Sequence, residues 1–152
     1  MDSASAVAAP HSSRKTRFYA AAAVLSLFGL ADAIYLTIEH ITGQSVRCTI
    51  IAGCSEVLSS EYAVIRGIPL ALIGAAAYFS VFSLATLAAF GYRVVGGLLT
   101  LQVAAMFLFS LWLIYLQAFV IHAFCQFCLF SAGITALLTV VVLLAWRSRS
   151  RP

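Results

Sequence analysis

The chain has 152 residues, of which 63% are hydrophobic and 9% are charged, and its formal net charge is +4. Soluble domains are about 45–50% apolar and about 25% charged, and a domain of this size leaves much of its surface in contact with water. The composition therefore excludes a soluble globular enzyme, a disordered chain and a free nucleic-acid-binding protein, and it indicates an integral membrane protein.

Apolar segments long enough to cross a membrane occur four times along the chain. A spanning helix needs about 20 mostly apolar residues, and this criterion predicts helices over residues 18–38, 68–90, 94–121 and 128–146. The third segment is the longest, which favours a tilted helix or one that projects beyond the bilayer. We therefore predict an all-α fold, an integral membrane four-helix bundle over residues 18–146, with a long outer loop that carries a pair of cysteines.

The basic residues predict the orientation of these helices. If the N-terminus lies inside, seven Lys and Arg residues fall on the cytoplasmic side and two, Arg47 and Arg66, fall on the outer side. Cytoplasmic loops carry an excess of Lys and Arg, so this bias favours both termini in the cytoplasm. Residues 1–17 are then expected to form a disordered cytoplasmic tail and residues 147–152 a basic one.

The first segment has a second interpretation, as a signal peptide. A basic stretch at residues 14–17 precedes the apolar run, and the Ala-Asp-Ala sequence at residues 31–33 resembles a cleavage site. The apolar run continues to Ile38, however, which favours a spanning helix.

All four cysteines lie on the predicted outer side, where disulfides are permitted in a bacterial periplasm or an organelle lumen. Cys48 and Cys54 fall in the long loop, and Cys125 and Cys128 form a C-x-x-C motif where the fourth helix starts. Unpaired N–H groups and the helix dipole favour a thiolate there. Three residues of helix place the second sulfur about 4.5 Å deeper, so we expect Cys125 to face the loop and Cys128 the membrane. This arrangement suits electron transfer from a water-side thiol to a lipid-side carrier.

Two non-catalytic interpretations of the cysteines are open. The C-x-x-C motif could bind zinc together with His122 or His40, and either pair could be a disulfide that only staples the outer face. Zinc is disfavoured because a structural zinc site rarely needs a membrane bundle. Exchange between the pairs is favoured over a staple, since two redox pairs lie on one side and a thiolate attacks only a disulfide that it can reach.

Four short motifs follow one another along the chain. A loop cysteine pair comes first, then Val-Leu-Ser-Ser at residues 57–60, then Gly-Ile-Pro at residues 67–69, and finally the C-x-x-C motif. This ordered set resembles the vitamin K epoxide reductase family, in particular its bacterial branch, over about residues 18–146. The resemblance implies a four-helix bundle around a quinone near the outer face. It also implies an enzyme that passes electrons from a thioredoxin-like partner to the quinone and so supports disulfide formation in exported proteins.

The resemblance also implies roles for individual residues. Cys125 and Cys128 correspond to the active-site pair, with Cys128 next to the quinone ring. Cys48 and Cys54 correspond to the shuttle pair, with Cys54 as the cysteine that exchanges with Cys125. Ser60 matches a hydroxyl position near the quinone site, although a helix cap or a loop hydrogen bond is the commoner role of a serine.

The chain departs from the vertebrate enzymes of this family at two positions. Ala132 stands where they carry a tyrosine, and the chain has no asparagine to hydrogen-bond a naphthoquinone. We therefore do not expect vitamin K epoxide turnover. The acceptor that the resemblance implies is a quinone, either ubiquinone or menaquinone. No thioredoxin-like domain is fused to the membrane part, so the expected partner is a separate periplasmic protein. The expected location is a bacterial inner membrane, with the cysteines on the periplasmic side.

Two further features bear on a quinone site. An acid inside a spanning helix indicates function, so Asp32 is a candidate proton donor, or else a hydrogen-bonding group within the bundle. Several aromatic side chains could line an apolar pocket, although packing or lipid contact is the commoner role of such residues. They are Phe79, Phe82, Tyr115, Phe119 and Phe124.

The main hypothesis is thus a membrane thiol:quinone oxidoreductase. A DsbB-type protein performs the same reaction, but its C-x-x-C motif precedes its widely spaced pair, which is the reverse of the order here. The non-enzymatic alternative is a structural or metal-binding membrane protein whose cysteines only staple the outer face.

Overall fold

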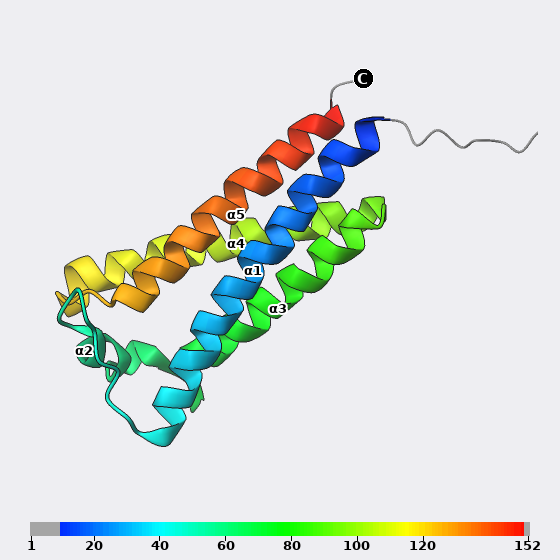
Figure 1. Cartoon of the computed structure of the whole chain (residues 1–152). Coiled ribbons are helices and arrows are strands. Elements are labelled where there is room, and N and C mark those ends of the chain that lie inside the picture. Colours follow the sequence, from blue (N-terminus) through cyan, green and yellow to red (C-terminus); the bar gives the residue numbers. More distant parts are fainter. Residues whose placement is uncertain (1–9, 151–152) are drawn as a thin grey trace, which may run out of the picture.

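A computed structural model describes residues 10–150 of the chain. Within these residues, four long helices form the bundle: α1 (Pro10–Thr42), α3 (Leu70–Ala89), α4 (Arg93–Leu116) and α5 (Gln126–Ser150) (Figure 1). α1 packs against α3 and α5, and α4 packs against the same two helices. All four are long and apolar enough to cross a membrane. The predicted fold class, an all-α membrane four-helix bundle, is confirmed.

Two of the helices extend further than the apolar segments predict. The chain is already helical at Pro10, so the prediction of a disordered tail is wrong for residues 10–17, while residues 1–9 lie outside the described residues. α5 likewise continues past Trp146 to Ser150. The residues by which these helices exceed the predicted segments include no glycine and no internal proline. A helix that is stable in the membrane can therefore continue into the polar region beyond it.

The start of α3 differs from its prediction because a small hairpin precedes it. β1 (Val64–Ile65) pairs with β2 (Ile68–Pro69) in an antiparallel register. Both residues of the connecting turn have positive φ, 52° at Arg66 and 85° at Gly67, which is the requirement of a type I′ turn. The residues predicted to open the second helix therefore form a strand, and the helix begins at Leu70.

Small side chains allow the helices to approach one another closely. The buried core contains many alanines, and Leu99, Val103 and Leu138 fill the space between them. On α1, a Cβ added at Gly29 would overlap the ring of Tyr78. Close contact at small residues is the usual way in which membrane helices pack.

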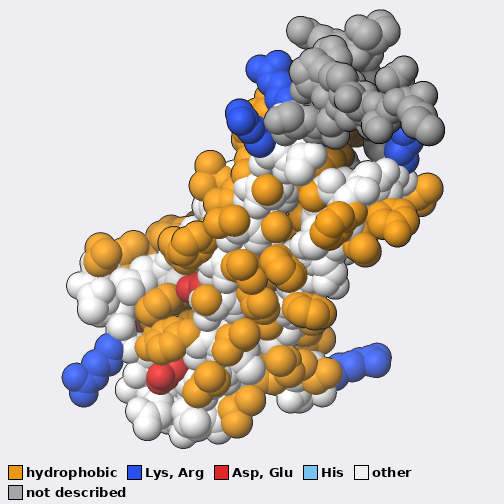
Figure 2. All heavy atoms as spheres, turned by 45° about the vertical axis from the view of Figure 1, so that its right-hand side comes forward, with side chains coloured by type: hydrophobic (Ala, Val, Ile, Leu, Met, Phe, Trp, Pro, Cys, Tyr) orange, Lys and Arg blue, Asp and Glu red, His pale blue; other side chains and the backbone are white. Residues whose placement is uncertain are grey.

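The outer surface of the bundle has the character of a lipid-facing surface. Large hydrophobic side chains are exposed along the helices, for example Phe28 on α1, Phe79 on α3 and Leu101 on α4. In Figure 2 hydrophobic side chains cover the flank of the molecule, while Lys and Arg side chains gather at its two ends. This distribution is the one expected for a protein that spans a bilayer.

One end of the bundle is covered by the connections between helices. The long loop after α1 contains α2 (Cys54–Leu58), the 3₁₀ turn η1 (Glu61–Ala63) and the hairpin. A π-helical turn, η2 (Gln117–Ile121), links α4 to the segment before α5, and α2 contacts this turn. All four cysteines lie at this end, which is the lower left in Figure 1.

Candidate functional site

The loop pair is a disulfide in this structure. Cys48 and Cys54 are bonded, with their Cα atoms 5.8 Å apart. Cys54 is the first residue of α2 and is 1% exposed, whereas Cys48 is only half-buried. Gly53 caps α2 at φ 135°, a conformation that L side chains rarely adopt. The turn that brings the two sulfurs together thus depends on this glycine.

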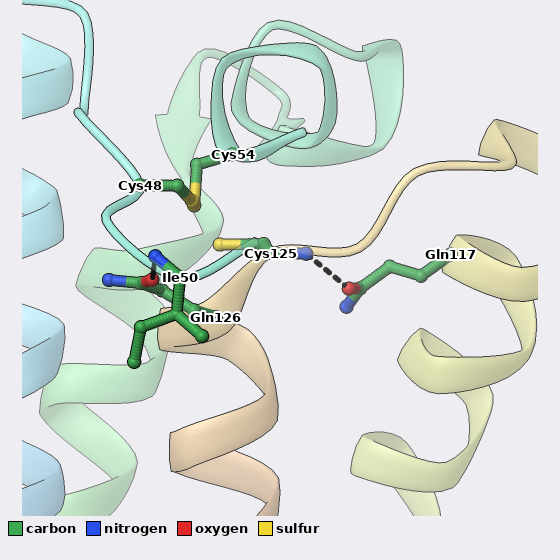
Figure 3. The surroundings of a disulfide bond; sticks show 6 residues. All are labelled: Cys48, Ile50, Cys54, Gln117, Cys125 and Gln126. Carbon is green, nitrogen blue, oxygen red and sulfur yellow. Dashed lines mark hydrogen bonds between the residues drawn. A yellow bond between two sulfur atoms is a disulfide. The ribbon is translucent and has the colours of Figure 1, made fainter. Parts of the chain in front are cut away.

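The loop disulfide lies beside the C-x-x-C motif. Cys54 and Cys125, which is 0% exposed, belong to one buried cluster. A Cβ added at Gly53 would lie 3.0 Å from the carbonyl oxygen of Phe124 and 3.3 Å from Cβ of Ala123. Figure 3 shows the sulfur of Cys125 pointing toward the Cys48–Cys54 bond. The structure therefore brings the two predicted pairs together.

Two glutamines join the segments that carry the cysteines. The Ile50 N–H donates to Oε1 of Gln126, which lies inside the C-x-x-C motif, at 3.0 Å. The Cys125 N–H donates to Oε1 of Gln117 on η2, also at 3.0 Å. Both bonds are drawn in Figure 3. The first ties the loop to the start of α5, and the second ties Cys125 to the end of the preceding helix.

Cys125 and Cys128 are free thiols, and the environment of Cys125 favours its thiolate. A hydrogen bond with the Cys128 thiol lowers the pKa of Cys125 from 9.0 to about 7. Backbone N–H groups of Phe127 and Cys128 add to this lowering, and burial opposes it. The sequence predicts a thiolate here from the helix start alone, but the second thiol of the motif has the larger effect.

A cavity of about 190 Å³ lies beneath the outer loop, between the helices. Its walls are mostly apolar and include Leu36, Val57, Ala71, Ile73, Phe109 and Leu113. Cys128 lies in the wall, and the few polar groups include Ser60 and Gln117. An apolar cavity with a small number of polar side chains is typical of a site for an organic ligand.

The structure shows a loop hydrogen bond for Ser60 and places the residue at the cavity. Ser60 lines the cavity, and its hydroxyl also donates a hydrogen bond of 2.6 Å to the carbonyl of Val57. The loop hydrogen bond therefore exists, and a role in binding a quinone stays a prediction.

The sequence-based predictions do not include a second group of polar side chains in the cavity, which consists of Tyr78, Ser131 and Thr135. The Tyr78 hydroxyl lies 2.7 Å from Oγ of Ser131 and 3.0 Å from Oγ1 of Thr135, and all three residues line the cavity. Asp32 is half-buried and lines the cavity as well. Ser131 and Thr135 follow Cys128 by three and seven residues, a spacing that puts all three side chains on one face of a helix. This pattern in the sequence indicates that Ser131 and Thr135 share the face of Cys128.

The aromatic side chains suggested for the pocket are not those that line it. None of the five predicted aromatic residues is in the cavity wall, which instead contains Phe109, Tyr62 and Tyr78. Phe79, Tyr115 and Phe119 are more than half exposed on the surface of the bundle. Each helix carries aromatic residues on several faces, so their identity alone does not tell which of them point inward.

The zinc interpretation finds no geometry to support it in the part of the chain that the structure describes. No group of three or more His, Cys, Asp or Glu side chains there could hold a metal ion. His40 lies in the cavity wall. His122 is exposed and adopts a left-handed conformation with φ 57° at the end of η2.

Comparisons with known proteins identify a family and a relative of this chain. The sequence profile of the Vitamin K epoxide reductase family matches residues 20–143. A 50-residue stretch of the chain is 44% identical to the thiol-disulfide oxidoreductase LTO1 of Arabidopsis thaliana. That stretch is 32% of this chain and 13% of the plant protein, so the chain corresponds to only a small part of that relative.

Proposed function

The chain belongs to the vitamin K epoxide reductase family, and from this premise we propose that it is a membrane thiol:quinone oxidoreductase. The family, together with the thiol-disulfide oxidoreductase relative, supports thiol–disulfide redox chemistry. The observation that carries the proposal is the contact between two cysteine pairs at the edge of an apolar cavity.

The exposure of the sulfurs favours Cys48 as the point of attack. Cys48 is half-buried, whereas Cys54 and Cys125 are almost fully buried. A thiolate attacks only a sulfur that it can reach. In the proposed first step, a thiolate of a separate thioredoxin-like partner attacks Cys48, the Cys48–Cys54 bond breaks, and Cys54 leaves as a thiolate.

The Cys54 thiolate then transfers the electrons inward. It attacks Cys125 in an oxidised Cys125–Cys128 pair, and Cys128 leaves as a thiolate. The second thiolate of the partner then attacks the partner's own sulfur in the mixed disulfide, so the partner leaves with a disulfide and Cys48 leaves as a thiolate. Cys48 then attacks Cys54, which re-forms the loop disulfide and releases Cys125 as a thiolate. The resulting state, with the loop pair oxidised and the inner pair reduced, has the same redox state as the structure.

The cavity suits a ubiquinone or menaquinone head group. Its walls are mostly apolar, Cys128 lies in them, and Ser60 and Gln117 are among the polar residues that line them. A bound quinone supplies an acceptor for two electrons and two protons. The role of the chain is to position that acceptor next to Cys128 and to stabilise the thiolate of Cys125.

The location follows from the same proposal. The excess of basic residues on one side of the predicted topology supports a topology with both termini in the cytoplasm and the cysteines on the outer face. If the membrane is a bacterial inner membrane, the electrons come from periplasmic thiols. The physiological result is disulfide formation in exported proteins.

A single-turnover experiment tests the proposal without the partner. Purified protein is reduced, freed of reductant and mixed under anaerobic conditions with a short-chain ubiquinone or menadione. We expect two thiols to be lost for each quinol formed, and we expect Cys128→Ser to form no quinol. Cys48→Ser is the matched control, because it removes a cysteine but leaves the inner pair intact. Quinol formation by Cys128→Ser at the parental rate would show that the assignment is wrong.

A further inference from the structure

Gln117 occupies an unusual position in the fold. It is the first residue of the π-helical turn η2, where the last turn of the third spanning segment widens. π-helical turns occur frequently at functional sites. The side chain is 3% exposed and lies inside an uncharged, mostly apolar segment. A buried amide has a large cost unless its polar atoms have partners.

One atom of this amide is fixed by the protein. Oε1 accepts the hydrogen bond from the Cys125 N–H, and because an N–H cannot donate to an NH₂ group, this bond determines which way the amide faces. The nitrogen Nε2, which carries two protons, therefore points away from the backbone of Cys125, as Figure 3 shows.

The Nε2 atom of Gln117 is accessible from the cavity. In residues 10–150 no acceptor is paired with Nε2 of Gln117, and no side-chain nitrogen or oxygen that is sealed from solvent lacks a partner. Nε2 is therefore accessible, and because Gln117 is almost fully buried and lines the cavity, the accessible space is the cavity itself.

The hydroxyl groups of Ser60 and Tyr78, which also lie in the cavity wall, already have internal partners. The Ser60 hydroxyl donates to the Val57 carbonyl. The Tyr78 hydroxyl lies within hydrogen-bond distance of oxygens on Ser131 and Thr135. Gln117 differs from them because both protons of its amide nitrogen are uncommitted.

We propose that Nε2 of Gln117 donates a hydrogen bond to a carbonyl oxygen of the quinone bound next to Cys128. This inference rests on the proposed function and names the amide that orients the ligand. The same side chain then has two functions, because its oxygen holds the backbone of Cys125 and its nitrogen holds the acceptor. The Gln117 amide thereby fixes the position of the quinone ring relative to the inner cysteine pair.

A comparison of two ligands separates this role from a purely structural one. Menadione carries two ring carbonyls, and 2-methylnaphthalene has a similar shape without them. Loss of one hydrogen bond to a buried carbonyl is expected to weaken binding about tenfold. We therefore expect Gln117→Met to weaken menadione binding about tenfold and to change binding of 2-methylnaphthalene less than about twofold. The matched control is Gln102→Met, which removes a glutamine on α4 that does not line the cavity.

An infrared measurement reports on the bond directly. With ¹³C-labelled carbonyls, the C=O stretch of bound menadione should lie below its frequency in an apolar solvent, and Gln117→Met should return it toward that frequency. Binding of 2-methylnaphthalene shows in the same samples that the variant is folded and that its cavity is intact.

The outcomes are distinguishable. Equal weakening of both ligands, or an unchanged carbonyl frequency in Gln117→Met, would overturn the role of Gln117 and leave the proposed function standing. Failure of the parent protein to bind menadione, ubiquinone or menaquinone would overturn the proposed function together with this inference.

Discussion

Gly53 is the residue through which the loop disulfide meets the C-x-x-C segment, and its substitution by alanine tests whether that contact matters. The residue adopts φ 135° and ψ −2°. Backbone conformations of this kind cost a non-glycine residue about 1–3 kcal/mol. The new Cβ would also lie 3.0 Å from the oxygen and 3.2 Å from the nitrogen of Phe124, closer than the ordinary contact distance of 3.4 Å or more.

The structure gives the size of the expected effect. Because both close contacts are to backbone atoms, no side chain can rotate away, and Cys54 must move from the Cys125 segment by a few tenths of an ångström. A misplacement of about 1 Å can slow a reaction by about a hundredfold. We therefore expect Gly53→Ala to slow the formation of a Cys54–Cys125 bond by about three- to tenfold.

The assay follows that bond in isolation. In a Cys48→Ser/Cys128→Ser background, Cys54 and Cys125 are the remaining cysteines of the chain. A mild oxidant starts cross-linking, acid quenching and alkylation stop it, and mass spectrometry measures the linked fraction over time. The same background tests the staple interpretation, because an exchange pair forms this cross-link readily.

Gly43→Ala is the matched control for backbone strain without contact. Gly43 has φ +67°, and a Cβ there meets no atom within 4 Å. Its substitution should cost about 1 kcal/mol of stability and should leave the cross-linking rate within about twofold of the parent. Equal rates for Gly53→Ala and the parent would refute the claim that this contact sets the distance between the two pairs.

Two further predictions concern the thiols and the packing of the bundle. With the loop disulfide intact, Cys128→Ala leaves Cys125 as the single thiol. The pKa of Cys125, measured as the midpoint of its thiolate absorbance titration, should rise above about 7, because the hydrogen bond that stabilises the thiolate is lost. An unchanged midpoint would exclude that hydrogen bond as the cause of the lowered pKa. Gly29→Ala should lower the free energy of unfolding in detergent by about 1–3 kcal/mol, because its Cβ overlaps the ring of Tyr78, whereas Gly97→Ala, with no atom within 4 Å, should not lower it.

The sequence predicts the helices well because lipid imposes a strong condition on composition. Any segment of the required length and apolarity must be helical to satisfy its backbone, so the spans are found from residue types alone. Their ends are not found in this way, since α1 is already helical at Pro10 and α5 continues to Ser150 in regions where the membrane no longer constrains the chain.

The site is predictable only in part, for a different reason. Cysteine spacing is visible in the sequence, so the sequence alone identifies both pairs. It does not identify Gln117 or Tyr78, because their importance depends on the direction in which their side chains point. The π-helical turn brings the Gln117 side chain to the Cys125 N–H, and the Tyr78 side chain reaches from α3 to Ser131 on α5. No local pattern of residue types predicts the direction of either side chain.

The burial of Cys125 gives the proposed mechanism a physical reason for its two cysteine pairs. A Cys125 that is 0% exposed, with a pKa near 7, is a reactive thiol that external thiols do not reach. An external reductant meets Cys48 first, because Cys48 is half-buried and Cys54 is hidden behind it. Transfer from Cys54 to Cys125 is then an intramolecular exchange between neighbours, which has a high effective concentration. In the proposed mechanism, access, more than thiol acidity, therefore determines the order of the electron-transfer steps, and the loop disulfide lies between the solvent and the proposed quinone.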